Sequence, residues 1–381
     1  MELESGISVA AICKDSDFCA EKIGKAFASL AAGVDEFILV RTGADDGSGK
    51  LVDRSGDPVV EGDLMNSPDW LKECCGDTHV VVYGSPWCWD FSHTRNFGLD
   101  RCVYDWLFII DADEILDGDS ALTLRELTGL NDEAVAYFIQ EHMYRLGKKV
   151  STVSTLRLFR NQPTMRYKGF IHNQLQFNGI AGNVDIVMHH YGGESEDHAA
   201  RVIRNEKFRD RIKERLDVNP DDYENFYNLI KTYSYDMEHK RVIEWGNKLI
   251  EKMYPEHREN PTREEKELLQ SYHRVYYMVG LAEMLYGNHR AAFDMCAYGA
   301  RFIESADLFF VAANAAYMSG DFPNAYLFFR RYLHRLPVEQ SGQEHAVSAT
   351  ETFLEYVRDK YAVLIQIKIK GGVEPFMERS A

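Results

Sequence analysis

Three carboxylates stand close together near residue 111, directly after a short apolar run. The run from Trp106 to Ile110 is too short for a helix and is typical of a buried parallel strand. Asp111, Asp113 and Glu114 follow it. Because ligands bind at the carboxyl ends of strands in an α/β sheet, and alternation sends Asp111 and Asp113 to one side, the pair suits one hard divalent cation, Mn²⁺ or Mg²⁺. A solvated acidic turn after a core strand is the alternative.

Alternating strands and helices must position these carboxylates. Apolar runs predict three strands before the central one, at 7–13, 37–40 and 80–83. The period of the apolar residues predicts a helix over 17–32, and the loop 41–48 is rich in turn formers. Strand, helix and strand followed by a polar, glycine-containing loop are typical of a nucleotide-binding βαβ layout. We interpret the polar segment 49–78 as an insertion.

The second half of the chain is rich in helix formers. Tyr286-Gly287-Asn288 and Ser319-Gly320-Asp321 repeat at an offset of 33 residues, with small residues and a closing Pro337 in the register of tetratricopeptide helix pairs. An earlier unit is predicted to start near Asn219, and the segment 256–267 interrupts the register as a longer linker or an extended helix. A helical bundle without repeat character is the alternative.

The composition indicates a globular protein of two domains. Of its 381 residues, 45% are hydrophobic and 27% charged. No apolar run approaches the length of about 18 residues that a membrane helix needs, and the acidic N-terminus lacks a signal-peptide pattern. Seven cysteines without metal-ligand spacing favour reduced thiols and a cytoplasmic protein. The net charge of −17 disfavours broad binding to nucleic acid, although residues 157–168 form a local basic stretch.

Several motifs, in the right order over roughly 190 residues, resemble family 2 glycosyltransferases of the GT-A fold. They are Lys14-Asp15-Ser16, Val40 to Ser48, Trp89 to Asn96, Phe108 to Glu114 (which contains the D-x-D motif), Arg157 to Arg160, Tyr167 to Asn173, and Met188 to Gly192. With the repeats that follow, the chain resembles the subgroup with C-terminal tetratricopeptide repeats, which includes peptide S-glycosyltransferases of the sublancin type.

The resemblance implies an α/β catalytic domain of GT-A fold over 1–198, with a Rossmann-like, mostly parallel sheet. An all-α, tetratricopeptide-like domain over 199–381, with a C-terminal tail, would follow. The implied activity is metal-dependent, inverting transfer of a hexose or pentose from a nucleotide-sugar donor, with a UDP-sugar favoured. The acceptor would be macromolecular, with a protein or peptide or a glycan favoured and a modified DNA base left open. We further expect a homodimer through the helical domain. We expect the protein to lie in the cytoplasm of a bacterium or of a virus-infected bacterial cell.

The resemblance also assigns roles to single residues. It implies metal ligation by Asp111, Asp113 and His190, and catalytic roles for Asp111, Asp113, Glu141 and His172. The implied donor-binding residues are Ala11, Lys14, Arg41, Asp46, Asp90, Arg95, Asn96 and Ala112. Arg95 suits a diphosphate because its guanidinium is forked and permanently charged. Asn96 could instead cap the following helix.

Two positions depart from the family pattern. Arg41 stands where the family has an Asp that commonly contacts the base, so the nucleotide is left open. Asn173 stands where the family has a Glu, and an amide cannot act as a general base. Glu141, His172 and Asp185 are the remaining candidates for the base. These departures favour a second hypothesis, a non-catalytic repeat scaffold with a degenerate nucleotide-sugar-binding domain, whereas the intact Asp111-x-Asp113 pattern opposes it.

Overall fold

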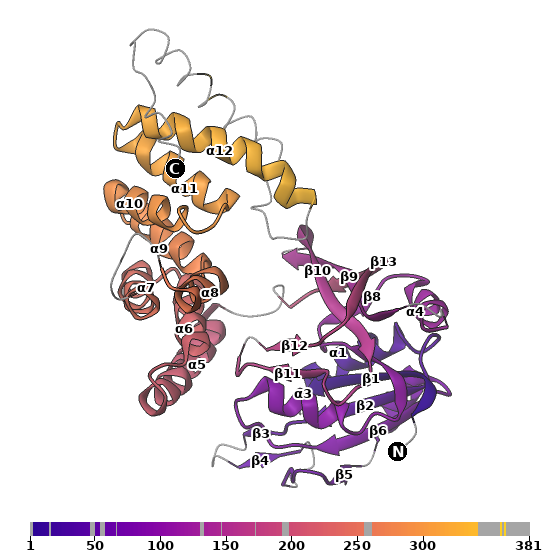
Figure 1. Cartoon of the computed structure of the whole chain (residues 1–381). Helices are drawn as coiled ribbons and strands as arrows, with labels where there is room; N and C mark the ends of the chain where they lie inside the picture. The colour runs from indigo at the N-terminus through magenta and orange to yellow at the C-terminus, as the bar shows by residue number, and fades with distance from the viewer. Residues whose placement is uncertain are drawn as a thin grey trace. The chain divides into compact units, whose positions relative to one another are not determined.

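The computed structural model forms two compact units, Met1–Arg201 and Val202–Ala381 (Figure 1). The sequence-based boundary at 198/199 lies at the start of a helix, three residues before this division. The described residues are 3–14, 17–45, 50–53, 58–65, 67–129, 133–145, 147–171, 173–192, 198–254, 261–341, 359 and 362. Asp46, His172 and all residues after 341 except 359 and 362 therefore lie outside the described residues.

The first unit is built around one nine-stranded sheet of order β5-β6-β2-β1-β7-β10-β9-β13-β8. Its strands are β1 (Glu4–Cys13), β2 (Glu36–Arg41), β5 (Leu64–Met65), β6 (His79–Gly84), β7 (Tyr104–Ile109), β8 (Glu114–Leu116), β9 (Ala134–Arg145), β10 (Lys148–Arg160) and β13 (Ile180–His190). Two small sheets pair β3 (Ala44–Asp45) with β4 (Leu51–Val52) and β11 (Arg166–Lys168) with β12 (Gln174–Gln176). The helices are α1 (Asp17–Ala28), α2 (Asp69–Cys75), α3 (Phe91–Leu99) and α4 (Ser120–Thr128).

The predicted fold class, an α/β unit followed by an all-α unit, is confirmed. Strands β6, β2, β1 and β7 are parallel and form the predicted nucleotide-binding layout. Beyond β7 the sheet is mixed, because β10 runs antiparallel to both β7 and β9. Strand β9 consequently points the same way as β7, and β13 is parallel to β9. The carboxyl ends of β7, β9 and β13 therefore lie at the same edge of the sheet.

The central strand is buried on both faces, as its apolar run predicts. Trp106 and Phe108 pack into a core with residues of α1 and α4, whereas Leu107 and Ile109 pack into a second core with Leu99 of α3. All four side chains are 1% exposed or less. Because alternate residues of β7 fill different cores, a shift of one residue in its register would move each of these side chains into the other core.

The segment interpreted as an insertion has regular structure of its own. It contains the short strands β4 and β5 and helix α2, whose Leu71 and Cys75 are buried. Strand β5 pairs with β6 and so forms one edge of the main sheet. The sequence did not predict these elements, because each of them is short and lies in a polar segment.

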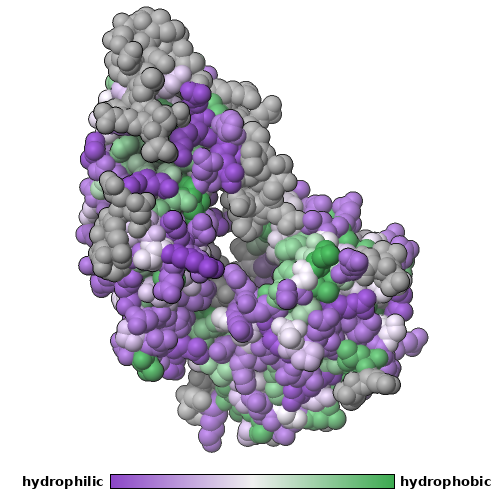
Figure 2. Space-filling view, viewed as in Figure 1, coloured by the Kyte–Doolittle hydropathy of each residue, from purple (hydrophilic) through white to green (hydrophobic). Residues whose placement is uncertain are grey.

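The second unit consists of packed helices in the described residues. They are α5 (His198–Val218), α6 (Tyr223–Tyr235), α7 (His239–Met253), α8 (Arg263–Ser271), α9 (Arg274–Leu285), α10 (His289–Gly299), α11 (Ala306–Met318) and α12 (Phe322–Ser341). None of the helices within the described ranges has the length and apolar character needed to cross a bilayer. On the face drawn in Figure 2, hydrophilic residues (purple) predominate on this unit.

The small-residue register of the repeats is confirmed by close helix contacts. A β-carbon at Gly280 would lie 2.2 Å from the Cys296 sulfur, so α9 and α10 can approach closely only because of this glycine. Gly287 and Gly320 adopt positive φ angles of 92° and 80° in the turns of successive helix pairs. The prediction that Pro337 closes the last unit is wrong, since α12 continues to Ser341. Proline removes one backbone N–H donor from α12. Packing of the buried residues Ala325, Phe328, Phe329 and Tyr332, upstream of Pro337, offsets this loss.

Candidate active site

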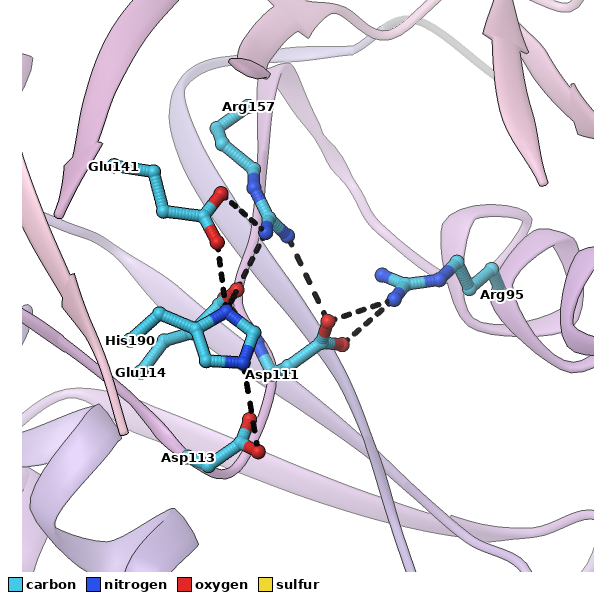
Figure 3. Close-up of polar contacts among 7 residues, drawn as sticks. All are labelled: Arg95, Asp111, Asp113, Glu114, Glu141, Arg157 and His190. Carbon is cyan, nitrogen blue, oxygen red and sulfur yellow. Dashed lines mark hydrogen bonds and ion pairs between the residues drawn. The ribbon is translucent and has the colours of Figure 1, made fainter. Parts of the chain in front are cut away.

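Seven charged side chains meet at the edge of the sheet where β7 ends (Figure 3). Asp111 and Asp113 lie in the turn after β7, and Glu114 starts β8. His190 at the end of β13 pairs with Glu114, and Met188, two residues before it, pairs with Glu141 of β9. Since alternate residues share a face, Glu114, Glu141 and His190 project from the same side of the sheet. Arg157 of β10 and Arg95 of α3 reach the group from two further elements.

Arg95 is bound to Asp111. Its Nη2 donates to both oxygens of the Asp111 carboxylate, at 2.7 and 2.9 Å. Burial alone would raise the pKa of Asp111, but the charges of Arg95 and Arg157 outweigh it and lower the pKa. Nε of Arg95 is buried and lacks a hydrogen-bond partner among the residues that the structure describes. Asp111 is therefore an ionised carboxylate whose main partner is a guanidinium.

Arg157 binds the buried carboxylates of the group. Its Nη2 donates to Glu114 and, at 3.2 Å, to Glu141, while its Nη1 lies 3.8 Å from Asp111. Glu114 is fully buried and Glu141 is 4% exposed. Burial would lower the pKa of Arg157, but these carboxylates outweigh it and raise the pKa. Arg157 is thus the counter-cation that makes the burial of two carboxylates tolerable.

His190 is fixed through one ring nitrogen. Its Nδ1 lies 2.7 Å from Glu141 and 3.3 Å from Glu114, and its Nε2 lies 3.8 Å from Asp113. Burial acts to lower the pKa of His190, but the two hydrogen-bonded carboxylates and Asp113 raise it to about 10. Carboxylates on Nδ1 commonly orient a histidine whose Nε2 ligates a metal. Nε2 and Asp113 face each other, as this arrangement requires.

Gly192 leaves room between Asp113 and His190. A β-carbon at position 192 would lie 2.4 Å from Oδ2 of Asp113 and 2.5 Å from Nε2 of His190. The backbone N–H of Tyr191 donates to the carbonyl oxygen of Asp113 at 2.9 Å, which holds the two turns together. Any larger residue at position 192 would fill the space between two of the predicted metal ligands.

The charges of the group fit a divalent cation. Asp111, Asp113, Glu114 and Glu141 supply four negative charges when ionised, and two arginines supply two positive ones. A histidine that ligates a metal is neutral, and with His190 in that form the sum is −2, which one divalent cation balances. Carboxylate oxygens and an imidazole nitrogen also form a donor set that Mn²⁺ accepts.

Two subsets of this group have the ligand types of a metal site. Ligand atoms of Glu114, Glu141 and His190 all lie within 4.8 Å of one another. Arg157 donates to both of these glutamates, so a cation held there would face a guanidinium. Like charges repel, so we favour Asp113 with Nε2 of His190 as the ligands. Asp111, which is itself bound to Arg95, would lie beside the cation.

The expected donor-binding residues lie at the carboxyl ends of the parallel strands. Ala11 is buried in β1 and Lys14 is exposed just after it. Arg41 ends β2. Asp90 caps α3, where its Oδ1 accepts from the backbone N–H of His93 at 3.0 Å, and the half-buried Ala112 lies between the acidic residues. These positions lie near the carboxyl ends of β1 and β2 and in the turn after β7, and their role in donor binding stays a prediction.

Asn96 lies inside α3, so the expectation that it caps a helix is wrong. Its side chain instead pairs with the backbone of Tyr167, donating to the carbonyl at 2.9 Å and accepting from the N–H at 2.8 Å. The guanidinium of Arg95 lies 5.4 Å from the centre of the Tyr167 ring. Asn96 thereby fixes the ring beside Arg95.

The sequence did not single out Arg157 and Glu114 as site residues. Arg157 belongs to a motif noted only for its resemblance, and Glu114 was counted as a third carboxylate without a role.

Of the candidate bases, Asp185 is exposed and lies five residues before His190, about 16 Å away along the strand. Burial opposes ionisation of Glu141, but His190 and Arg157 lower its pKa to about 2.

Comparison with known proteins gives partial likenesses. No protein-family model matches the chain. A curated TPR repeat-containing protein of Synechococcus elongatus is 26% identical over 166 residues, which are 44% of this chain. The match spans about a third, 34%, of the length of that relative.

Solved structures with partial likeness to the chain include TarS, a mannosyltransferase and MamA. S. aureus TarS 1-349 in complex with UDP-GlcNAc is 12% identical, with a TM-score of 0.38 over 82% of this chain and 92% of that one. Mannosyltransferase PcManGT from Pyrobaculum calidifontis, in complex with GDP-Man and Mn²⁺, is 11% identical, with a TM-score of 0.39 over 97% and 89%. MamA covers 46% of this chain and 98% of its own, with 15% identity and a TM-score of 0.27. A mannosyltransferase and a TPR repeat-containing protein thus stand among the proteins with partial likeness to this chain, and the sublancin-type subgroup stays a prediction.

Proposed function

We propose that the first unit is a metal-dependent glycosyltransferase that moves a sugar from a nucleotide-sugar donor, with a UDP-sugar favoured, to a macromolecular acceptor. The supporting observation is the arrangement of Asp113, His190 and Gly192 at the edge of the sheet where the parallel strands end. A divalent cation bound there would stabilise the diphosphate leaving group. Asp113 and His190 would hold it, with Asp111 beside them.

Arg95 and Arg157 have different roles in this proposal. Arg95 keeps a buried, unpaired Nε–H and lies at the donor edge, so it would bind the diphosphate while remaining paired to Asp111. Arg157 is enclosed by carboxylates and would hold Glu114 and Glu141 in place. It lowers the pKa of Glu141, whereas burial raises the pKa of Glu114 in spite of it. Glu141 in turn would orient His190.

Glu141 is a poor candidate for the general base. A carboxylate with a pKa of about 2 that already accepts hydrogen bonds from two cationic groups holds a proton weakly. We therefore assign Glu141 a positioning role. The base would be supplied by His172, which lies outside the described residues, or by the acceptor complex.

The helical unit would bind the acceptor or form a homodimer. The donor-side residues of the described chain all belong to the first unit, and stacked helix pairs provide extended binding surfaces. A non-catalytic scaffold is the competing hypothesis, but it gives no reason for a glycine that leaves space between Asp113 and His190.

A donor screen tests the proposal. Thermal shift of the full-length protein with UDP- and GDP-sugars, each with and without Mn²⁺, should show stabilisation that requires both nucleotide and metal. Mass spectrometry of co-purified molecules, before and after incubation with the best donor, should then show acceptors that gain the mass of one sugar. No stabilisation by any nucleotide sugar with Mn²⁺ would favour the scaffold.

A further inference from the structure

A hydrogen-bonded group of side chains lies on the face of β13 opposite to His190. His189 directly precedes His190, and successive residues of a strand point to opposite faces of the sheet. While His190 points towards Asp113 (Figure 3), the half-buried ring of His189 therefore lies on the other face. Its partners there are Tyr144 of β9 and Asp117, which follows β8. The group joins the ends of three strands behind the proposed metal site.

Tyr144 contacts both residues that flank His190 in the chain. Its hydroxyl oxygen lies 3.1 Å from Nδ1 of His189, within hydrogen-bond distance. Its ring stacks on the ring of Tyr191, with ring centres 5.0 Å apart and planes 29° from parallel. One side chain of β9 thus holds the residue before His190 and the residue after it.

The chemistry of its partners sets the direction of the hydrogen bond to His189. Nε2 of His189 lies 3.3 Å from Oδ1 of Asp117, and because a carboxylate only accepts, Nε2 carries the hydrogen of the neutral ring. Nδ1 then accepts from the Tyr144 hydroxyl. The side chain of Asp117 is 61% exposed, so solvent screens its contact with His189. Tyr144 is therefore the stronger of the two partners.

The backbone around His190 needs this support, because His190 is the last residue of β13 and strand ends fray. On the site face, Glu141 lies 2.7 Å from Nδ1 of His190, and the Tyr191 N–H donates to the Asp113 carbonyl at 2.9 Å. A rotation of the backbone between His189 and Tyr191 would swing the imidazole of His190 aside, and metal–ligand distances tolerate changes of only about 0.2 Å. Contacts to both neighbours of His190 from the opposite face oppose this rotation.

We propose that Tyr144 and His189 are positioning residues for the metal site, which act through Tyr191 and His190. Neither side chain would touch the cation or the donor. The inference rests on the proposed function, because it requires that His190 ligates a divalent cation. It adds a second requirement on the opposite face of the sheet, namely the Tyr144 hydroxyl and an acceptor at the position of Nδ1 of His189. If the group only stabilised the strand ends, a folded variant would keep its metal affinity.

Titration of the full-length protein with MnCl₂ by calorimetry tests the proposal. His189→Leu removes both ring nitrogens, whereas Tyr144→Phe removes only the hydroxyl and keeps the ring that stacks on Tyr191. Well below the thermal midpoint of each variant, both substitutions should weaken Mn²⁺ binding about 3- to 10-fold. His189→Asn, whose amide oxygen can accept near the position of Nδ1, should restore the affinity to within about twofold of the wild type.

His142→Leu is the matched control. His142 pairs with His189 across the two strands, with ring centres 5.6 Å apart, so the control makes the same chemical change on the same face. Within the described residues the Tyr144 hydroxyl is bonded to His189 and not to His142. This variant should therefore keep the Mn²⁺ affinity of the wild type. A loss as large as that in His189→Leu would overturn the proposal, because the loss of any imidazole from this face would then suffice.

Hydrogen exchange of the metal-free protein gives a readout that does not depend on the metal. Because the Tyr191 N–H donates to Asp113, peptic fragments that cover 188–192 should exchange severalfold faster in His189→Leu and Tyr144→Phe than in the wild type or in His142→Leu. Unchanged exchange in both variants would overturn the proposal.

The outcomes separate this inference from the proposed function. If the wild type binds Mn²⁺ and both His189→Leu and Tyr144→Phe bind it equally tightly, the inference alone is overturned. If the wild type does not bind Mn²⁺, the proposed function is overturned and the inference with it. Weaker Mn²⁺ binding and faster exchange in the two variants, with rescue by His189→Asn, is the result that we expect.

Discussion

Gly192 lies so close to His190 that a β-carbon at position 192 would be 2.5 Å from the imidazole Nε2. The same β-carbon would lie 2.4 Å from Oδ2 of Asp113. The missing side chain therefore keeps open the space between the two residues that we expect to bind the metal. Because this space has a defined size, several substitutions around it have predictable effects.

Gly192→Ala should weaken Mn²⁺ binding about 10- to 100-fold, because its methyl group must push Asp113 or His190 aside. Isothermal titration calorimetry with MnCl₂ measures the effect. Gly129→Ala is the matched control, since Gly129 has an ordinary helical conformation and its added β-carbon would meet its nearest neighbour at 3.4 Å. Equal Mn²⁺ affinity in both variants would show that the space next to Gly192 does not hold the metal.

Glu141→Gln should lower Mn²⁺ affinity about tenfold and reduce turnover mainly through that loss, because the amide orients His190 less firmly. Saturating Mn²⁺ should then restore most of the rate. A variant that binds Mn²⁺ as tightly as the wild type but turns over orders of magnitude more slowly would instead identify Glu141 as the base.

Arg157→Leu should destabilise the protein by about 3–5 kcal/mol, because it leaves Glu114 and Glu141 buried without their cation. Urea unfolding measures the change. Removing the cation raises the pKa of both carboxylates, so protonation at lower pH relieves the repulsion, and the loss should be smaller at pH 5 than at pH 8. A loss below about 1 kcal/mol, the value for exposed ion pairs, would contradict this role.

Arg95→Ala should weaken binding of the nucleotide diphosphate by about 1.5–3 kcal/mol, which is roughly 10- to 150-fold in the dissociation constant. The reason is the loss of a forked cation that Asp111 holds at the donor edge. Arg125→Ala is a suitable control, because Arg125 pairs with Asp35, which directly precedes β2 at the amino ends of the parallel strands, opposite the edge with the acidic group. Titration calorimetry with UDP should detect the difference, and an unchanged affinity in Arg95→Ala would remove Arg95 from the donor site.

The sequence predicted much of the fold because the signals were local. The apolar run 106–110 predicted a strand buried on both faces, and the carboxylates after it predicted the edge where the site lies. Gly287 and Gly320 predicted the turns between paired helices. Short elements such as β5 lacked a periodic signal, and Pro337 proved compatible with the helix it was expected to end.

The site was harder to predict because its partners are distant in sequence. Arg157 and Glu141 are brought to Asp111 by long-range pairing of β7, β10 and β9, with two shifts in the β9–β10 register. Periodicity within one strand cannot reveal such a register. The sequence therefore indicated Asp111, Asp113 and His190 as a set, but not the arginine that neutralises the carboxylates around them.

The most direct test of the central claim is donor turnover with and without a divalent cation. Release of sugar from the nucleotide sugar that most stabilises the protein should be measured for the wild type and for Asp113→Asn, in Mn²⁺ and in excess chelator. We predict turnover by the wild type in Mn²⁺, its loss in chelator with recovery when Mn²⁺ is restored, and no turnover by a folded Asp113→Asn variant. A full rate in chelator, or a wild-type rate in Asp113→Asn, would contradict the proposed metal-dependent transfer.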